Sequence, residues 1–398
     1  MKPKILYLHQ YFKTPQEGGA IRSFYIAQAL AQAGFEVVII TSHNEKKCRI
    51  AQIQNFEVRY LPIAYDNHFN TFTRIAAFLK FLFQAYCEAK KISNVRLVYA
   101  TSTPLTVGIT ALWLKYWHKK KYIFEVRDLW PQAPIEMRVI RNNLLKKILY
   151  WLEKKIYHQA EAVIALSQGI EQYIRQKTNK PVYLIPNMAD NEVFNPCNQS
   201  QKYVLPQHNF LKDKFVVTYF GTLGKANHLN YLLEIARIAQ QRQFTQLFFL
   251  IIGKGAEEKK LKAQAQTWQL QNLLFIEHQS KTNLIYFLNL TYATYISFLD
   301  LPVLQTTSPN KFFDSLAAGK LCIVNVQGWL KELVEKNECG FYAPPHQPEV
   351  FLEKIRPFVQ NPNLLAQYQA NAQRLAQTQF DKNFLCQKVI EVVKKLTI

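Results

Sequence analysis

Charged side chains that could act on a substrate follow directly after a short apolar run. The run Tyr122–Val126 is typical of a buried strand, and Arg127 and Asp128 come next. A guanidinium at a strand end can hold a phosphate or an acceptor charge with two parallel hydrogen bonds, and a carboxylate can orient or deprotonate a hydroxyl. Glu125 is expected at the same cleft mouth. The alternative is a purely structural pair between Arg127 and Asp128.

A second group of such residues lies in the segment 308–319, which reads SPNKFFDSLAAG. It predicts a helix with Asn310 and Lys311 in its first turn. A helix N-terminus carries about half a positive charge and free N–H donors. Together with Lys311 it would bind a diphosphate without a metal, and Asp314 adds one carboxylate. The alternative is an ordinary amphipathic helix.

Glycine-containing loops could also approach a ligand closely. The first reads Gly18-Gly19-Ala20-Ile21-Arg22-Ser23 and precedes a helix that Ser23 could cap. Loops of the second half contribute further candidates: Gly221, Thr222, Lys225, Gly253, Lys254 and His278. Ordinary turns would explain the glycines of the first loop and of 253–255 equally well, and a single loop histidine is not informative.

Short apolar runs alternate with helical patterns along the whole chain. Strand candidates follow one another from Ile5–Leu8 to Val182–Ile185, and the rhythm restarts at Val216–Phe220. This alternation is typical of βαβ units and parallel sheets, which bind ligands at the carboxyl ends of their strands. We therefore predict an α/β fold with two doubly wound, Rossmann-like domains facing across a cleft. The expected boundaries are 1–190, 191–380 and a final helix, 381–398, that returns to the first domain.

The net charge of +21 over 398 residues predicts an anionic partner, either a membrane, a nucleic acid or a phosphorylated substrate. The excess is concentrated, since residues 71–155 carry 16 basic and 5 acidic side chains. Helix-turn-helix, zinc-finger and RNA-recognition signatures are absent from the sequence, which disfavours nucleic acid.

Cysteine usage and hydropathy bear on the compartment. The six scattered cysteines form no CxxC pair, which predicts reduced, mostly buried thiols of the cytoplasm. The strand-like start at Lys4–Leu8 predicts no signal peptide. The segment 97–117 has one charged residue, Lys115, and could be mistaken for a membrane span. Thr101-Ser-Thr-Pro104 instead predicts a strand followed by a helix.

From Leu6 to about Gly340, seven loop motifs occur in the order and spacing of one family. On these motifs the chain resembles the retaining GT-B glycosyltransferases of family 4, and most closely the fucosamine-transferase-like branch of O-antigen and capsule synthesis. Arg127-Asp-Leu-Trp-Pro131 matches the form of that branch. The resemblance implies transfer of a sugar from a nucleotide diphosphate donor, expected to be a UDP-sugar, to an acceptor, with retention and without metal or other cofactor.

The resemblance also assigns roles to residues. It implies that Gly18, Gly19 and Arg22 face the donor diphosphate and the acceptor, and that Arg127 and Asp128 lie beside the reacting sugar. The expected donor contacts are Gly221, Thr222, Lys225, Gly253, Lys254, His278, Asn310, Lys311 and Asp314.

Two departures from the family pattern stand out. Many members carry Arg and Lys where this chain has Thr222 and Asn227. Their usual pair of glutamates is replaced by Thr306 and Asp314. Lys225, Lys311 and backbone N–H groups remain as candidate phosphate ligands.

Basic and aromatic residues are interleaved over 72–91 and 113–122, a composition that suits a lipid interface. We therefore expect a cytoplasmic protein, peripheral on the inner membrane surface, with a lipid-diphosphate-linked or saccharide acceptor. The alternative is that many of the 72–91 aromatic residues belong to the core. A nucleotide-sugar epimerase on the same architecture, and a non-catalytic basic binding protein, are the rival functions.

Overall fold

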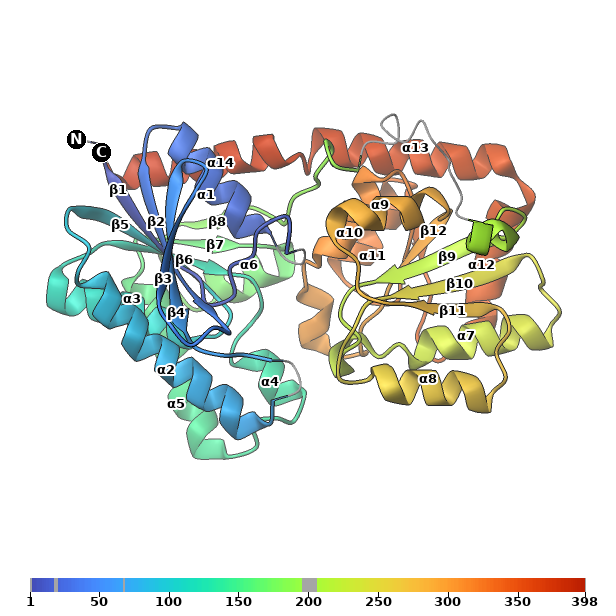
Figure 1. Cartoon of the computed structure of the whole chain (residues 1–398), viewed down its shortest axis with the longest axis horizontal. Coiled ribbons are helices and arrows are strands. Elements are labelled where there is room, and N and C mark those ends of the chain that lie inside the picture. Colours follow the sequence, from blue (N-terminus) through green and yellow to red (C-terminus); the bar gives the residue numbers. More distant parts are fainter. Residues whose placement is uncertain (1, 18–20, 67–68, 195–205, 398) are drawn as a thin grey trace.

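The computed structural model describes residues 2–17, 21–66, 69–194 and 206–397, and it contains one parallel sheet in each half of the chain (Figure 1). Each sheet is covered on both faces by helices. The central strands are buried on both faces and are therefore almost continuously apolar, as in LFFLII at 247–252.

The first sheet has the strand order β3-β4-β2-β1-β5-β6-β7-β8. Only the β3–β4 pair is antiparallel. Because β1 lies between β2 and β5, the strand order reverses there, and the crevice beyond the carboxyl ends of β1 and β5 is the expected ligand position. The strands are β1 Lys4–Leu8, β2 Glu36–His43, β3 Arg49–Ile53, β4 Phe56–Pro62, β5 Val95–Thr101, β6 Tyr122–Val126, β7 Ala162–Ala165 and β8 Val182–Leu184.

The second sheet has the order β11-β10-β9-β12-β13-β14, with every pair parallel. This is the Rossmann order, and its reversal lies between β9 and β12. The strands are β9 Phe215–Phe220, β10 Leu247–Ile252, β11 Leu273–Ile276, β12 Ala293–Ile296, β13 Leu321–Val324 and β14 Gly340–Tyr342.

Helices connect the strands in both domains. Those of the first domain are α1 Arg22–Gln32, α2 Thr71–Ala89, α3 Thr106–His118, α4 Gln132–Glu136, α5 Asn143–Gln159 and α6 Gln168–Arg175. Those that follow are α7 Asn230–Gln241, α8 Glu258–Thr267, α9 Lys281–Asn289, α10 Asn310–Ala317, α11 Trp329–Lys336, α12 Pro348–Gln360, α13 Pro362–Thr378 and α14 Lys382–Thr397. Short 3-10 helices occupy η2 Pro206–Leu211, η3 Lys225–Asn227 and η4 Pro302–Thr306.

The last two helices cross between the domains along one edge of the molecule (Figure 1). Helix α13 packs on α10 and β13, whereas α14 packs on α1 and β5 of the first domain. Ala189 pairs with Asp381 where the chain returns. There the Lys382 ammonium donates to Asp190 Oδ1 at 2.9 Å, and Tyr25 donates to the other carboxylate oxygen. The crossing is therefore fixed by buried charge as well as by packing.

The fold class agrees with the sequence prediction, and three local details sharpen it. Residues 97–117 divide as expected into β5 and α3, and no helix in the described part of the chain is long and apolar enough to cross a membrane. The edge strand β3 was not predicted, because its residues are mostly exposed. The predicted Ser23 cap is wrong, since Ile21 precedes α1 without a side-chain cap and Ser23 accepts a hydrogen bond from Tyr7.

Most of the described cysteines are buried, as the sequence predicts. The five described cysteines are free thiols. Three of them are buried, but Cys48 and Cys87 are exposed.

Candidate active site

Two cavities meet in the cleft between the domains. The interdomain cavity measures about 330 Å³ and is lined by His9, Tyr11, Thr103, Arg127, Asp128, Leu166, Asn187, Phe298, Thr307, Ser308, Pro309 and Asn310. The second-domain cavity measures about 270 Å³ and is lined by Phe220, Gly221, Thr222, Asn227, Ile252, His278, Gln279, Lys281, Leu284, Asn310, Lys311 and Asp314. Asn310, at the start of α10, belongs to both. One bound molecule could therefore extend from one cavity into the other.

Lys311 lines the second-domain cavity, as does Lys281. The Lys311 ammonium donates to the Tyr219 hydroxyl at 2.8 Å and to Asn227 Oδ1 at 3.0 Å, and it lies 4.1 Å from the centre of the Tyr219 ring. Both hydrogen-bond partners are neutral. Burial lowers the pKa of Lys311 to about 7, because desolvation penalises its charged form. A bound anion would stabilise the charged form of Lys311 and so offset the cost of its desolvation.

The start of α10 adds backbone donors to the same place. Pro309 precedes the helix, and no side chain caps it. The first N–H groups of a helix have no intrahelical acceptor. The predicted helix at 308–319 is thus present, with Asn310 and Lys311 in its first turn and both lining the second-domain cavity.

Asp314 lies one turn further along α10 and also lines the second-domain cavity. It accepts a hydrogen bond from the Lys281 ammonium at 2.9 Å. Burial raises the pKa of the Asp314 carboxyl, while the neighbouring Lys281 acts in the opposite direction. Sequence reasoning did not single out Lys281 as a site residue, because only the fold brings the start of α9 beside α10.

The remaining donor predictions divide between cavity and scaffold. Gly221, Thr222 and His278 line the second-domain cavity. A Cβ atom on Gly221, whose φ is +135°, would approach Lys311 Cε to 3.3 Å. Partial desolvation lowers the pKa of His278, and the charge of Lys254 acts in the same direction.

Three other predicted donor contacts do not line either cavity. Gly253 has φ +151°, and a Cβ there would lie 1.9 Å from the Gly221 carbonyl oxygen, so this glycine serves the packing of two adjacent loops. Its N–H donates to the Ile276 carbonyl, and the Lys254 carbonyl accepts from the Leu223 N–H. Lys225 is exposed at the start of η3. The structure therefore favours the reading of 253–255 as a strand–helix turn.

Arg127 and Asp128 line the interdomain cavity, at the carboxyl end of β6. The Arg127 guanidinium donates to His9 Nε2 at 3.2 Å, and its backbone N–H donates to Ser102 Oγ at 3.0 Å. Among the described side chains no ion pair joins Arg127 to Asp128, so the alternative of a structural pair is not supported.

His9 orients Arg127 from the end of β1. The ring is buried, and both burial and the Arg127 charge lower its pKa well below the usual value. A neutral ring that accepts through Nε2 carries its proton on Nδ1. His9 is a site residue that sequence reasoning missed, although its position directly after the first strand was a usable signal.

Asp128 is exposed toward the interdomain cavity, which it lines. Desolvation by the protein atoms around the cleft raises the pKa of its carboxyl, against the opposing effect of Arg127. Near neutral pH such a group can accept a hydrogen bond from a hydroxyl and move toward its proton. The interdomain cavity thus offers the chemistry of hydroxyl orientation.

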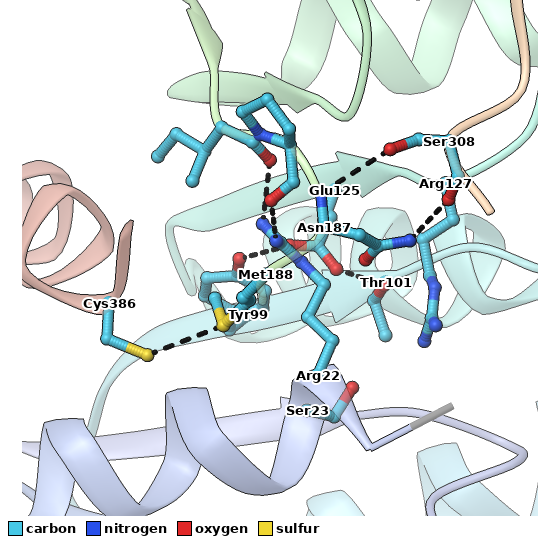
Figure 2. A network of polar contacts seen from close by, with 12 residues as sticks. Arg22, Ser23, Tyr99, Thr101, Glu125, Arg127, Asn187, Met188, Ser308 and Cys386 are labelled. Carbon is cyan, nitrogen blue, oxygen red and sulfur yellow. Dashed lines mark hydrogen bonds and ion pairs between the residues drawn. The ribbon is translucent and has the colours of Figure 1, made fainter. Parts of the chain in front are cut away.

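Arg22 occupies a different place from the one predicted. Its side chain is fully buried, and its Nε donates to Glu125 Oε2 at 3.0 Å (Figure 2). The remaining guanidinium nitrogens donate to the carbonyls of Ile185 and Pro186. Glu125 also accepts from Tyr99 and Thr101. Arg22 therefore fastens the interdomain connection and is not available to a diphosphate, and Glu125 is not at the cleft mouth.

Two further predictions concern the edges of the site. Gly18 and Gly19 lie outside the described residues. Thr306, in the position of the family's first glutamate, lines neither cavity: its hydroxyl donates to Val303, and its carbonyl accepts from Ser167 of the first domain. The adjacent Ser308 instead lines the interdomain cavity, where Asn187 donates to its carbonyl (Figure 2).

No group of three or more His, Cys, Asp or Glu side chains is arranged as metal ligands within the described ranges. The site is built from Lys311, a helix N-terminus and amide and hydroxyl groups. These residues suit a phosphorylated ligand, and metal independence stays a prediction.

Comparisons with known proteins agree with this geometry. Residues 17–187 match the family model "Glycosyl transferase 4-like domain", and residues 201–375 match "Glycosyl transferases group 1". The first match covers the strands of the first sheet except β1, the second covers the whole second sheet, and together they span most of the chain.

Individual relatives are distant in sequence but similar in fold. A probable glycosyltransferase, WbjE of Pseudomonas aeruginosa, is 22% identical over 278 residues, which cover 67% of this chain and 68% of that protein. Sucrose-phosphate synthase from Thermosynechococcus elongatus superposes with a TM-score of 0.80 at 16% identity, covering 99% of both chains. Anabaena Alr3699/HepE, solved with UDP and glucose, gives 0.71 at 17% identity, covering 98% of this chain and 99% of that one. The chain is therefore a glycosyltransferase of the GT-B fold, with a Glycosyl transferase 4-like domain followed by a Glycosyl transferases group 1 domain.

Proposed function

We propose that the second-domain cavity binds a nucleoside diphosphate sugar and that the interdomain cavity binds the acceptor. The observation that carries this proposal is Lys311, a part-buried cation whose hydrogen-bond partners are neutral, at the uncapped start of α10. A diphosphate supplies the negative charge that this arrangement lacks. We propose UDP as the nucleotide of the donor, because the similarly folded Anabaena Alr3699/HepE was solved with UDP and with UDP-glucose.

The proposed reaction replaces one bond at the anomeric carbon by another. The bond to the donor's β-phosphate oxygen breaks, and the diphosphate leaves with the electron pair. The acceptor oxygen forms the new bond on the same face, so that configuration is retained, and its proton passes to the leaving phosphate. Lys311 and the α10 N–H groups stabilise the charge that develops on the diphosphate, which is the largest expected contribution to catalysis. Asp128 orients the acceptor hydroxyl, and no metal is required.

The acceptor and the cellular role extend this proposal. We infer a lipid-diphosphate-linked or saccharide acceptor, an N-acetylhexosamine or deoxyhexosamine as the transferred sugar, and a role in cell-surface polysaccharide synthesis such as O-antigen or capsule. The support is the Arg127-Asp-Leu-Trp-Pro131 motif of that branch. By the same inference, we propose that the enzyme acts at the cytoplasmic face of the membrane.

A thermal-shift panel of UDP, GDP, ADP and their sugars tests the donor. We expect stabilisation by UDP and UDP-sugars, because a ligand that binds only the folded state stabilises it by mass action. Absence of a response to all nucleotides would contradict the proposal. Incubation with UDP-N-acetylhexosamine alone separates the two enzyme classes, since full conversion to a different nucleotide sugar would show an epimerase rather than a transferase.

A further inference from the structure

Large apolar side chains are exposed along two helices of the first domain. On α2 they lie three or four residues apart, and on α5 they show a similar spacing, so each set forms one stripe. The exposed residues are Phe72, Ile75, Leu79 and Phe83 on α2 and Leu144, Leu145, Ile148 and Trp151 on α5. Phe72 is 85% exposed and Trp151 is 60% exposed. Exposed apolar surface on this scale marks an interaction site.

Helix α3 connects the two stripes. The Phe83 ring lies 5.4 Å from Trp113 of α3, and the Lys155 ammonium of α5 lies 5.3 Å from the ring of Tyr116. Gly108 allows the close approach of α5, since a Cβ there would lie 2.6 Å from Ile156 Cδ1. The three helices lie together on one side of the first sheet (Figure 1). The eight residues of the two stripes, with Tyr116 and Trp117, form what we name the outer apolar face.

The charges around the outer apolar face are predominantly positive. Helices α2, α3 and α5 contain two carboxylates, Glu88 and Glu153, and both are paired. Glu88 is held by Arg59 and Lys91, and the buried Glu153 is held by Lys177. Basic residues are abundant on and beside α5: Arg138, Arg141, Lys146, Lys147, Lys154 and Lys155.

We propose that the outer apolar face inserts into the headgroup region of an anionic membrane. Apolar side chains flanked by lysine and arginine favour this environment, because burial of the stripes and attraction to anionic lipids add together. A second copy of the chain fits less well, since two faces rich in lysine and arginine and with both carboxylates already paired would repel each other. This inference rests on the proposed function, because it identifies the acceptor as a molecule held at the membrane.

Another face of α2, next to the exposed stripe, connects the outer apolar face to the acceptor cavity. Phe78 of α2 packs with Trp130, their ring centres 6.2 Å apart, two residues beyond Asp128. Tyr65 stacks on Phe78 at 6.0 Å and contacts Tyr11, which lines the interdomain cavity, at 4.6 Å. In this arrangement helix α2 lies between the proposed membrane surface and the interdomain cavity. A lipid-linked hydroxyl at the membrane surface would reach Asp128 by passing this helix.

Flotation of the full chain with phosphatidylcholine vesicles, and with vesicles of three parts phosphatidylcholine to one part phosphatidylglycerol, tests the inference. Wild type should float with the mixed vesicles and only weakly with pure phosphatidylcholine. The variants Phe72→Ser/Phe83→Ser and Ile148→Ser/Trp151→Ser should each bind about tenfold or more weakly, because they remove apolar insertion. Phe210→Ser, at a comparably exposed position of the second domain, is the matched control and should bind like wild type.

Charge is tested separately. Lys147→Gln/Lys154→Gln should weaken binding to the mixed vesicles about fivefold for each lysine, whereas Lys259→Gln/Lys260→Gln on α8 should not. Wild type that does not float, stripe variants that float normally, or a dimer in sedimentation velocity that the stripe variants dissociate would each overturn the inference. UDP binding and transfer to a soluble acceptor report on the proposed function and should be unchanged in all these variants.

Discussion

Two enclosed cations, one on each side of the cleft, show how similar sequence signals lead to different roles. Arg22 and Lys311 both follow small or polar loop residues at the start of a helix, and both were predicted to face a phosphate. Arg22 is neutralised by Glu125 and by two backbone carbonyls. Among the described residues, the hydrogen-bond partners of the Lys311 ammonium are a hydroxyl and an amide oxygen. A buried cation with its own carboxylate maintains the structure, whereas one held by neutral oxygens is suited to an incoming anion.

The largest effect is expected from breaking the Arg22 pair. Arg22→Leu should lower the free energy of unfolding by about 3–5 kcal/mol, because Glu125 is left buried and uncompensated. Urea unfolding measures this change. Arg22→Leu/Glu125→Leu should be less destabilised than the sum of the two single variants. If Arg22→Leu left the stability unchanged and weakened nucleotide binding, Arg22 would be a donor-binding residue instead.

Asp128→Asn should lower kcat by about a hundredfold or more with little effect on folding, since the acceptor hydroxyl loses its oriented carboxylate. Desolvation in the cleft raises the pKa of Asp128, and we expect the ionised form to be the active one. Wild-type activity should therefore fall as the pH falls through this raised pKa, and the fall should begin at a higher pH than for an ordinary aspartate. If the activity of Asp128→Asn fell at the same low pH as that of wild type, the fall would be due to the titration of another group.

His9 acts on the reaction through Arg127, so its substitution should have a moderate effect. His9→Ala should lower kcat/KM by about two- to tenfold, the cost of one hydrogen bond. His9→Gln, which retains an acceptor oxygen, should recover part of this loss. Equal activity of the two variants would show that His9 only fills space.

The smallest expected effect is the uptake of less than one proton when UDP binds. The pKa of Lys311 is about 7, so its amine is mostly neutral at pH 8 in the free protein. A bound diphosphate favours the ammonium and raises this pKa, so UDP binding at pH 8 should take up somewhat less than one proton, and progressively less below pH 7. Calorimetry in buffers of different ionisation enthalpy measures the uptake, which Lys311→Met should abolish.

The sequence predicted the loops of the site because local signals place them. Arg127 and Gly221 directly follow β6 and β9, and His278 lies two residues beyond β11; a parallel sheet brings such strand ends to one edge. The helix at 308–319 was also visible as a pattern. The resemblance to one family placed these loops in order, and the fold agrees with it.

Partners that are distant in sequence could not be predicted in the same way. Arg22 meets Glu125 across 103 residues, and Lys281 meets Asp314 only through the packing of α9 beside α10. Gly253 resembled a ligand-binding glycine, yet it is required by the neighbouring Gly221 carbonyl. Such contacts depend on tertiary packing, which no local spacing of residues reveals.

Lys311 and Lys225 provide the most direct test of where the donor diphosphate binds. Both were candidate phosphate ligands, but Lys311 lines the second-domain cavity and Lys225 does not. The decisive measurement is the Kd of UDP for wild type, Lys311→Ala and Lys225→Ala by calorimetry. We predict that Lys311→Ala weakens binding about tenfold or more, the cost of a charge-assisted hydrogen bond, while Lys225→Ala binds like wild type. Unchanged affinity in Lys311→Ala, or a loss confined to Lys225→Ala, would contradict the assignment of the donor site.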